Sequence, residues 1–311
     1  MILRLLAATA ASAAVAGAAV YGPALASGGT KGALSYREGG RWVTWWRSDA
    51  APPPWDGRGP LAARVAWRAG APGVEWGELQ LRGAGEAWRT RVVLARLDPA
   101  QVGLALSPAF TEDRRWSVAD AEDDVAVAFA AGQFRESLPW GWVVSGGREI
   151  LSPQYAPLAG AVVVDSSGVV RIVAPDSVAV ARRRGGVREA FQSYPVLLQN
   201  GAVPAALTKP GSGVNVAHRD ARLALCTMPD DRVVVALTRF DALGETLGRV
   251  PFGLTSAEMA AVMGGLGCRQ ALLLDGGISG QLRIREADGS ARTWAGTRSV
   301  PLGLVGRPRT R

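Results

Sequence analysis

The sequence predicts an α+β protein with a large mixed, mostly antiparallel sheet and few helices. From about residue 74 onward, short apolar segments alternate with turns rich in glycine, proline and aspartate, as strands with tight connections do. The strongest helical spacing covers residues 256–266. No repeat of fixed period runs through the chain, which argues against solenoids and propellers.

The composition is that of an ordinary globular protein. The chain has 311 residues, of which 48% are apolar and 20% charged, enough for a substantial core. The net charge is +8, but the arginines are scattered, and Arg182-Arg183-Arg184 is their only run of three. Since nucleic-acid binding needs a clustered basic stripe or a recognisable reading motif, we expect no nucleic-acid partner.

The first 26 residues have the pattern of a secretory signal peptide. Arg4 precedes an uncharged apolar stretch over 5–20, and Ala24-Leu25-Ala26 resembles a cleavage site. We therefore expect export to the periplasm or the medium, with membrane contact only through this segment. The alternative is an uncleaved membrane anchor, for which the apolar stretch is short.

Residues 27–73 form a leader that differs in amino-acid composition from the main domain, which is expected over 74–308. It contains Pro52-Pro53-Pro54, many glycines and five tryptophans, at positions 42, 45, 46, 55 and 67. Core packing is the ordinary role of such aromatic side chains, and stacking on sugar rings is the alternative.

Strands are expected wherever apolar runs end at turn residues. The expected strands cover 75–82, 88–97, 101–106, 125–130, 142–144, 161–164, 169–173, 194–198, 223–227, 233–238, 270–274, 281–285, 291–294 and 302–305. Turn chemistry predicts hairpins for 161–173, 223–238 and 281–294, and the short gap predicts one that joins 88–97 to 101–106. A short helix is expected at 117–121, capped by Ser117.

The strongest predicted helix begins after Thr255. Glu258 stands three residues after this N-cap, which is the spacing of a capping box. An apolar stripe at helical spacing follows, formed by Met259, Val262, Met263 and Leu266. Gly265 and Gly267 close the helix.

The turn after the next strand is the best candidate site. Asp275 follows three leucines and precedes Gly276 and Gly277, so a buried strand carries a carboxylate to the edge of a sheet. The glycines allow a ligand to approach the main chain, and their N–H groups, with Ser279, can form an anion pocket. The alternative is an ordinary tight loop.

This helix, Gly267-Cys268 and the strand that ends in Asp275-Gly276-Gly277-Ile278-Ser279 together resemble the phosphodiester glycosidase family. Its pattern is matched by Gly253, Glu258, Ala260, Met263, Leu266, Gly267, Cys268, Ala271, Leu274, Asp275, Gly276, Gly277 and Ser279. Looser similarities are 130–134, 141–147, 194–201, 222–225 and 295–302, so the resemblance covers about 75–308.

Four positions depart from the family pattern. Ala130 and Leu273 stand where the family has asparagine, Gln133 replaces a phenylalanine, and Gly280 replaces a serine. The two lost asparagines would help to hold a substrate or to orient the acid.

The resemblance implies roles for particular residues. Asp275 is expected to be the catalytic carboxylate, because cleavage of a sugar-phosphate diester needs an acid or base near the anomeric centre. Arg222 and Arg298 are expected to bind the phosphate. The further substrate-binding candidates are Gly132, His218, Gly276, Gly277 and Ser279, and the candidates for a second carboxylate are Asp220 and Glu136.

Cys226 and Cys268 are the two cysteines. Both flank strands expected in one sheet, so a disulfide is predicted, with two buried thiols as the alternative. No metal-ligand cluster or P-loop is present, and no cofactor is expected.

The function expected from these features is that of an exported hydrolase that cleaves a sugar-phosphate phosphodiester or a related glycosidic bond in a glycan. Bacterial relatives in the family are linked to exopolysaccharide or cell-wall glycans. The alternative is a catalytically degenerate protein on the same fold that binds glycans or assembles envelope polysaccharide, as the lost asparagines favour.

Overall fold

The computed structural model of the protein describes residues 32–49, 55, 59–207, 213–215, 217–241 and 247–309. The expected signal segment at 1–26 and the Pro52-Pro53-Pro54 run lie outside these residues. Within the described part of the chain, no helix is both long enough and apolar enough to cross a membrane.

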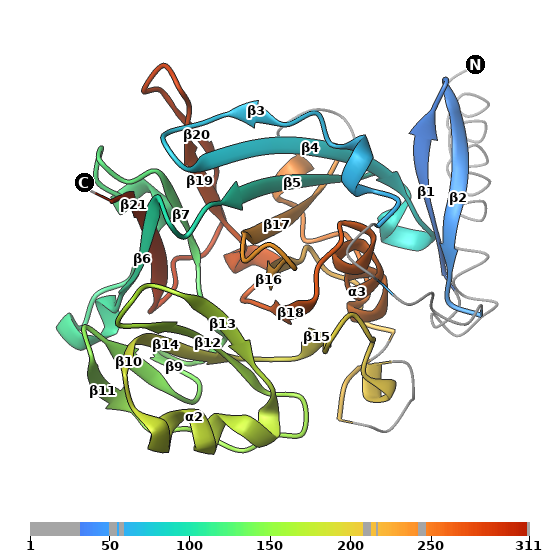
Figure 1. Cartoon of the computed structure of the whole chain (residues 1–311). Coiled ribbons are helices and arrows are strands. Elements are labelled where there is room, and N and C mark those ends of the chain that lie inside the picture. Colours follow the sequence, from blue (N-terminus) through green and yellow to red (C-terminus); the bar gives the residue numbers. More distant parts are fainter. Residues whose placement is uncertain are drawn as a thin grey trace, which may run out of the picture.

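Three antiparallel sheets form the body of the molecule (Figure 1). The largest has nine strands in the order β15-β18-β16-β17-β5-β4-β1-β2, with β3 beside β4. Its strands are β1 (Ala33–Glu38), β2 (Arg41–Arg47), β3 (Arg68–Ala69), β4 (Val74–Arg82), β5 (Thr90–Leu97), β15 (Val196–Leu198), β16 (Leu223–Thr227), β17 (Val233–Phe240) and β18 (Gln270–Leu273).

Two five-stranded sheets and a short ribbon complete the strands. One sheet runs β11-β10-β14-β12-β13, the other β20-β19-β7-β21-β6. Their strands are β6 (Val102–Ser107), β7 (Val127–Ala130), β10 (Val143–Ser145), β11 (Arg148–Leu151), β12 (Gly160–Asp165), β13 (Val170–Val173), β14 (Val187–Ser193), β19 (Leu282–Arg285), β20 (Ala291–Trp294) and β21 (Gly303–Pro308). The ribbon pairs β8 (Phe134–Arg135) with β9 (Leu138–Pro139).

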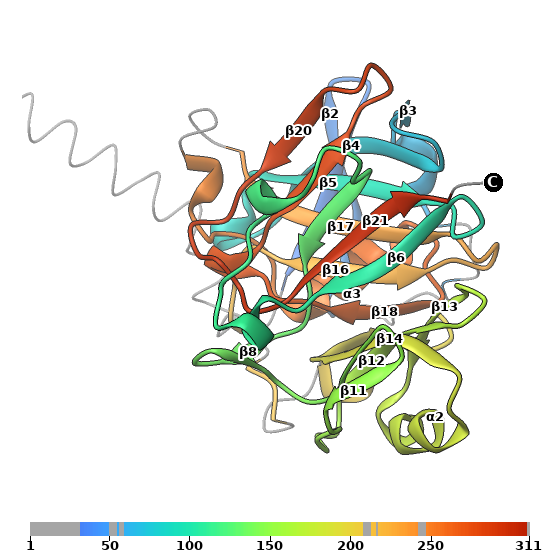
Figure 2. The ribbon, with the colours of Figure 1, turned by 90° about the vertical axis from the view of Figure 1, so that its left-hand side faces the viewer.

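Alternating side chains divide the core between the faces of the large sheet. On β5, Val93 and Ala95 face a cluster shared with both five-stranded sheets, whereas Val92 and Leu94 face a second cluster with helix α3 (Ser256–Gly265). Helix α2 (Val178–Arg184), which the sequence did not predict, covers the outer face of the β10–β14 sheet (Figure 2).

Helix α3 has the predicted capping box. Thr255 Oγ1 accepts from the Glu258 N–H at 3.2 Å, and Glu258 Oε2 accepts from the Thr255 N–H at 2.9 Å. The predicted single apolar stripe, however, does not describe the helix, because nearly all of its residues are buried. A side chain at Gly264 or Gly265 would meet Trp55 or Trp45, so the leader covers the side that a stripe would leave to solvent.

The leader is part of the large sheet. Strand β1 pairs with β2 and with β4, which joins this N-terminal hairpin to the main domain. Trp46 and Trp55 lie in the same cluster as α3, whereas Trp42 is 40% exposed. Trp46 and Trp55 therefore contribute to core packing.

The predicted hairpins β12–β13, β16–β17 and β19–β20 are confirmed, as is the short helix capped by Ser117. The hairpin predicted between 88–97 and 101–106 is wrong. Strand β6 pairs with β21 in another sheet, because β4 and β17 already occupy both edges of β5. Every pairing between the described strands is antiparallel, as the predicted fold class requires.

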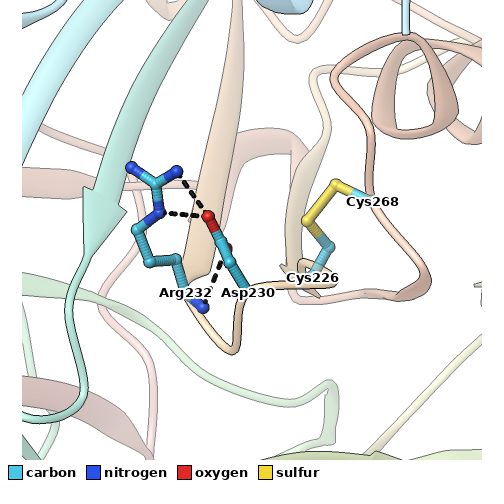
Figure 3. Close-up of a disulfide and its surroundings, with 4 residues drawn as sticks. All are labelled: Cys226, Asp230, Arg232 and Cys268. Atoms are coloured by element: carbon cyan, nitrogen blue, oxygen red, sulfur yellow. Dashed lines mark hydrogen bonds and ion pairs between the residues drawn. A yellow bond between two sulfur atoms is a disulfide. The ribbon is translucent and has the colours of Figure 1, made fainter. Parts of the chain in front are cut away.

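Cys226 and Cys268 form the predicted disulfide, with 5.8 Å between their Cα atoms (Figure 3). Cys226 lies on β16 and Cys268 follows α3, and both are fully buried. Near them, Arg232 Nε donates to Asp230 Oδ2 at 2.7 Å in the β16–β17 turn. The bridge therefore fastens α3 to the centre of the large sheet.

Replacement of both cysteines by alanine is expected to lower the free energy of unfolding by about 2–4 kcal/mol. The bridge spans a sequence separation of 42 residues, and a closed loop restricts the unfolded chain. Urea titration of the double variant would measure the loss, and wild-type protein in reductant should show a similar one. An unchanged midpoint would contradict a stabilising role.

Candidate functional site

The Asp275-Gly276-Gly277 turn is held between two segments that are distant in sequence. The Asp275 N–H donates to the Ala131 carbonyl at 3.0 Å, just beyond β7. The Gly277 N–H donates to the Ala221 carbonyl at 2.7 Å, just before β16. The turn thus lies where the large sheet meets one of the five-stranded sheets.

Both glycines are required by close contacts. A side chain at Gly276 would come within 2.5 Å of the Ala221 carbonyl. Gly277 has φ +56°, and its Cβ would lie 2.8 Å from Asp220 Oδ2. Because the Gly277 N–H already has a partner in Ala221, it is not free to bind an anion as we expected. The contact with Asp220 instead brings a second carboxylate against the turn.

The Asp275 side chain is partly buried, and its carboxyl group is only partly hydrogen-bonded. Among the described residues, none hydrogen-bonds to its buried Oδ2. The pKa of Asp275 is raised from 3.8 to about 7, mainly by burial and also by the charge of Asp220, and hydrogen bonding to Ser279 and the charge of Arg298 oppose this rise. Asp275 therefore holds its proton on a substantial fraction of molecules at neutral pH.

Asp220 is the second carboxyl group of the site. Its Oδ2 lies 3.5 Å from His218 Nε2. Burial raises the pKa of Asp220, against the charges of Arg222 and His218, which lower it. Glu136, the other candidate, is exposed in the β8–β9 turn.

Two buried arginines position the segment that carries Asp220. Arg219 makes two hydrogen bonds to the Glu258 carboxylate, at 2.6 and 2.8 Å, and so ties the segment to α3. Arg222 is 8% exposed; its Nε donates to the Leu254 carbonyl at 2.8 Å and its Nη2 to the His218 carbonyl at 2.6 Å. Since these contacts occupy two of its nitrogens, the structure gives Arg222 a positioning role, and direct phosphate contact by Arg222 stays a prediction.

Arg298 is the exposed cation beside Asp275. Its guanidinium carbon lies 4.6 Å from the centre of the Phe134 ring. Arg115, which the sequence did not single out, lies 5.6 Å from the same ring, and its Nη2 donates to the Glu136 carbonyl at 3.0 Å. No ion pair of Arg298 is found within the described residues. Arg298 is therefore placed to meet an anion at the mouth of the site.

Gly132 and Gln133 connect β7 to the site. A side chain at Gly132 would overlap the Gln192 carbonyl, so glycine allows this close approach of two strands. Gln133 Oε1 accepts from Ser193 Oγ and from the Tyr194 N–H, both at 2.8 Å, and its Nε2 donates to the Leu274 carbonyl at 3.3 Å. Gln133 therefore cross-links the strand before Asp275 to the β14–β15 connection. Gly132 acts here through its backbone, and a contact with substrate stays a prediction.

A hollow of about 430 Å³ adjoins this cross-link. Its wall consists mostly of aromatic and aliphatic side chains. The lining residues are Gln133, Phe134, Arg135, Trp140, Ala156, Pro157, Leu158, Tyr194 and Gly213. The sequence did not indicate this hollow, because its residues come from separate segments and only their aromatic character marks them.

The site therefore combines a partly buried carboxylic acid, a second carboxylate with a histidine, and an exposed arginine. Such a set can donate a proton, activate water and bind an anion. Within the described residues, no group of three histidine, cysteine, aspartate or glutamate side chains could hold a metal ion.

The fold is similar to those of known proteins. The structure is similar to the catalytic domain of zebrafish N-acetylglucosamine-1-phosphodiester alpha-N-acetylglucosaminidase, auto-inhibited by its pro-peptide, with a TM-score of 0.57 at 13% identity over 84% of this chain and 94% of that one. It is also similar to a hypothetical protein from Synechocystis, with a TM-score of 0.51 at 15% identity over 76% of this chain and 62% of that one.

No curated protein matches the chain. The family model for phosphodiester glycosidases matches residues 120–305, which is more than half of the sequence and includes Asp275. The family and the shared fold support a glycosidase-type function. The chain belongs to the phosphodiester glycosidase family.

Proposed function

We propose that the protein is an exported hydrolase that cleaves a sugar-phosphate phosphodiester, or a related glycosidic bond, in a glycan. The observation that carries this proposal is the partly buried carboxyl of Asp275, whose pKa is raised to about 7 beside Asp220 and Arg298. An acid with a pKa near the working pH is suited to proton transfer at a glycosidic oxygen.

In the reaction, Arg298 binds the phosphate and the sugar lies over the Asp275 turn. Asp275 donates its proton to the phosphate oxygen as the bond from that oxygen to the anomeric carbon breaks. Asp220, paired with His218, accepts a proton from the water whose oxygen bonds to the anomeric carbon. The products are the free sugar and a phosphate monoester.

Export rests on two features. The first 26 residues have the signal-peptide pattern, and the Cys226–Cys268 disulfide suits an oxidising compartment. Together they favour a glycan substrate outside the cytoplasm, such as an exopolysaccharide or a cell-wall polymer.

The test is an assay of purified protein, residues 27–311, for sugar release from sugar-1-phosphodiesters and for nitrophenol release from a nitrophenyl phosphodiester. Turnover by wild-type protein would support a hydrolase. Ala130 and Leu273 are buried and apolar where the family has asparagine, which favours a second candidate, a degenerate glycan-binding protein. Inactivity together with measurable glycan binding would favour this second function.

Arg298→Gln is expected to raise KM for a phosphodiester about ten- to hundredfold. A hydrogen bond to a charged group contributes about 1.5–3 kcal/mol, and this variant removes the exposed cation beside Asp275. Steady-state kinetics would measure the change. Arg171→Gln, an exposed arginine on β13, is the matched control, and equal KM values for the two variants would contradict phosphate binding by Arg298.

A further inference from the structure

The hollow beside the site differs in chemistry from a sugar pocket. Phe134, Trp140, Pro157 and Leu158 give it an apolar wall. A sugar presents several hydroxyl groups, and its recognition requires polar side chains with hydrogen bonds to spare. An apolar wall favours a ligand whose burial removes hydrocarbon from water.

Two polar side chains in this wall, Gln133 and Tyr194, already have partners in the protein. Gln133 uses its oxygen for Ser193 and Tyr194 and its nitrogen for Tyr194 and Leu274. The Tyr194 hydroxyl donates to the Gly213 carbonyl at 2.6 Å. Arg135, the charged residue of the lining, is exposed. The interior of the hollow therefore offers little to a polyhydroxylated group.

The hollow and the cations of the site share one aromatic neighbour, the Phe134 ring. Phe134 lines the hollow, and the guanidinium carbons of Arg298 and Arg115 lie 4.6 and 5.6 Å from the centre of its ring. A phosphate bound by these arginines would stand at the Phe134 edge of the hollow. One of its ester groups could then reach Asp275 and the other could enter the apolar space.

We propose that this hollow binds the alcohol half of the phosphodiester substrate, and that this alcohol is apolar. The proposal rests on the proposed function, since it assigns the second ester group of the same substrate. Among the glycan phosphodiesters of the proposed function, it selects those in which the phosphate links the sugar to a hydrocarbon alcohol, either a lipid or an aromatic compound.

Calorimetric titration with ethyl, butyl and hexyl phosphate tests the hollow without the need for turnover. The affinity should rise by roughly fourfold for each methylene that is buried, and at least tenfold from ethyl to hexyl phosphate. Phenyl phosphate, which has six carbons in a ring, distinguishes an aromatic alcohol from a lipid alcohol. Tighter binding of phenyl than of hexyl phosphate would indicate an aromatic alcohol, and the reverse a lipid.

Ala156→Trp fills the hollow and should abolish the dependence on chain length. Ala100→Trp, in a separate and charged surface hollow, is the matched control and should retain it. Arg298→Gln should lower the affinity for every alkyl phosphate by a similar factor. Equal affinity for ethyl and hexyl phosphate in wild-type protein would overturn the proposal, and so would an undiminished chain-length dependence in folded Ala156→Trp.

These titrations separate the two proposals. Asp275→Asn protein should give the same chain-length series as wild-type protein, because binding in the hollow does not use the acid. If the affinity rises with chain length but the protein has no hydrolytic activity, the apolar binding site is supported and the hydrolase function is contradicted. If the protein hydrolyses phosphodiesters but its affinity does not depend on chain length, the hydrolase function is supported and the apolar binding site is contradicted.

Discussion

Asp275→Asn is expected to lower sugar release by about 10²–10⁴-fold, the usual contribution of a positioned acid or base. The carboxyl lies at the centre of the site, with Asp220, Ser279 and Arg298 as its neighbours. Asparagine has nearly the same shape but carries no transferable proton. The loss should therefore appear in kcat, with the chain-length dependence of alkyl phosphate binding unchanged.

Asp123→Asn is the matched control for this loss, because the Asp123 side chain is exposed. Sugar release is measured for wild-type protein and both variants at the same pH, with circular dichroism as a check on folding. Full activity in Asp275→Asn would show that the reacting acid lies elsewhere.

The same substitution is expected to stabilise the protein above neutral pH. The pKa of Asp275 is raised from 3.8 to about 7 in the folded protein, so the unfolded chain releases this proton first as the pH rises. Between about pH 4 and 7 the wild-type protein loses stability from this group, and above pH 7 the loss stays constant. A shift of this size corresponds to about 4 kcal/mol.

Asparagine has no charge to bury, so the variant lacks this loss. The difference in unfolding free energy between Asp275→Asn and wild type should therefore be near zero at about pH 4 and approach ~4 kcal/mol at about pH 8. Urea titrations at the two pH values measure it. Asp123→Asn should show no such growth. A difference independent of pH would mean that Asp275 ionises normally in the folded protein.

Local signals predicted the fold where neighbours in sequence are neighbours in space. The Thr255–Glu258 capping box and the β16–β17 hairpin depend on such contacts and are confirmed. The predicted pairing of β6 was wrong because its actual partner, β21, lies about 200 residues further along the chain. The burial of α3 on all sides likewise depends on Trp45 and Trp55, which no helical periodicity can reveal.

In the candidate site, too, local features could be predicted from the sequence and contacts between distant segments could not. Asp275 could be predicted because the strand, the turn and the family pattern are contiguous. The contact of Asp220 with Gly277 joins two segments through the sheet, so the sequence could name Asp220 only as a candidate. The wall of the hollow joins Phe134 and Trp140, at the β8–β9 ribbon, to Tyr194 of the β14–β15 connection, and only the folded chain brings these segments together.

The proposed reaction depends on Asp275 as a carboxylic acid that keeps its proton near neutral pH. The most direct measurement is an NMR titration of protein with ¹³C-labelled aspartate, in which the Asp275 carboxyl signal is identified by its absence from Asp275→Asn. We expect the Asp275 carboxyl to titrate with a midpoint at about pH 7. A midpoint near 4 in the folded protein would contradict it.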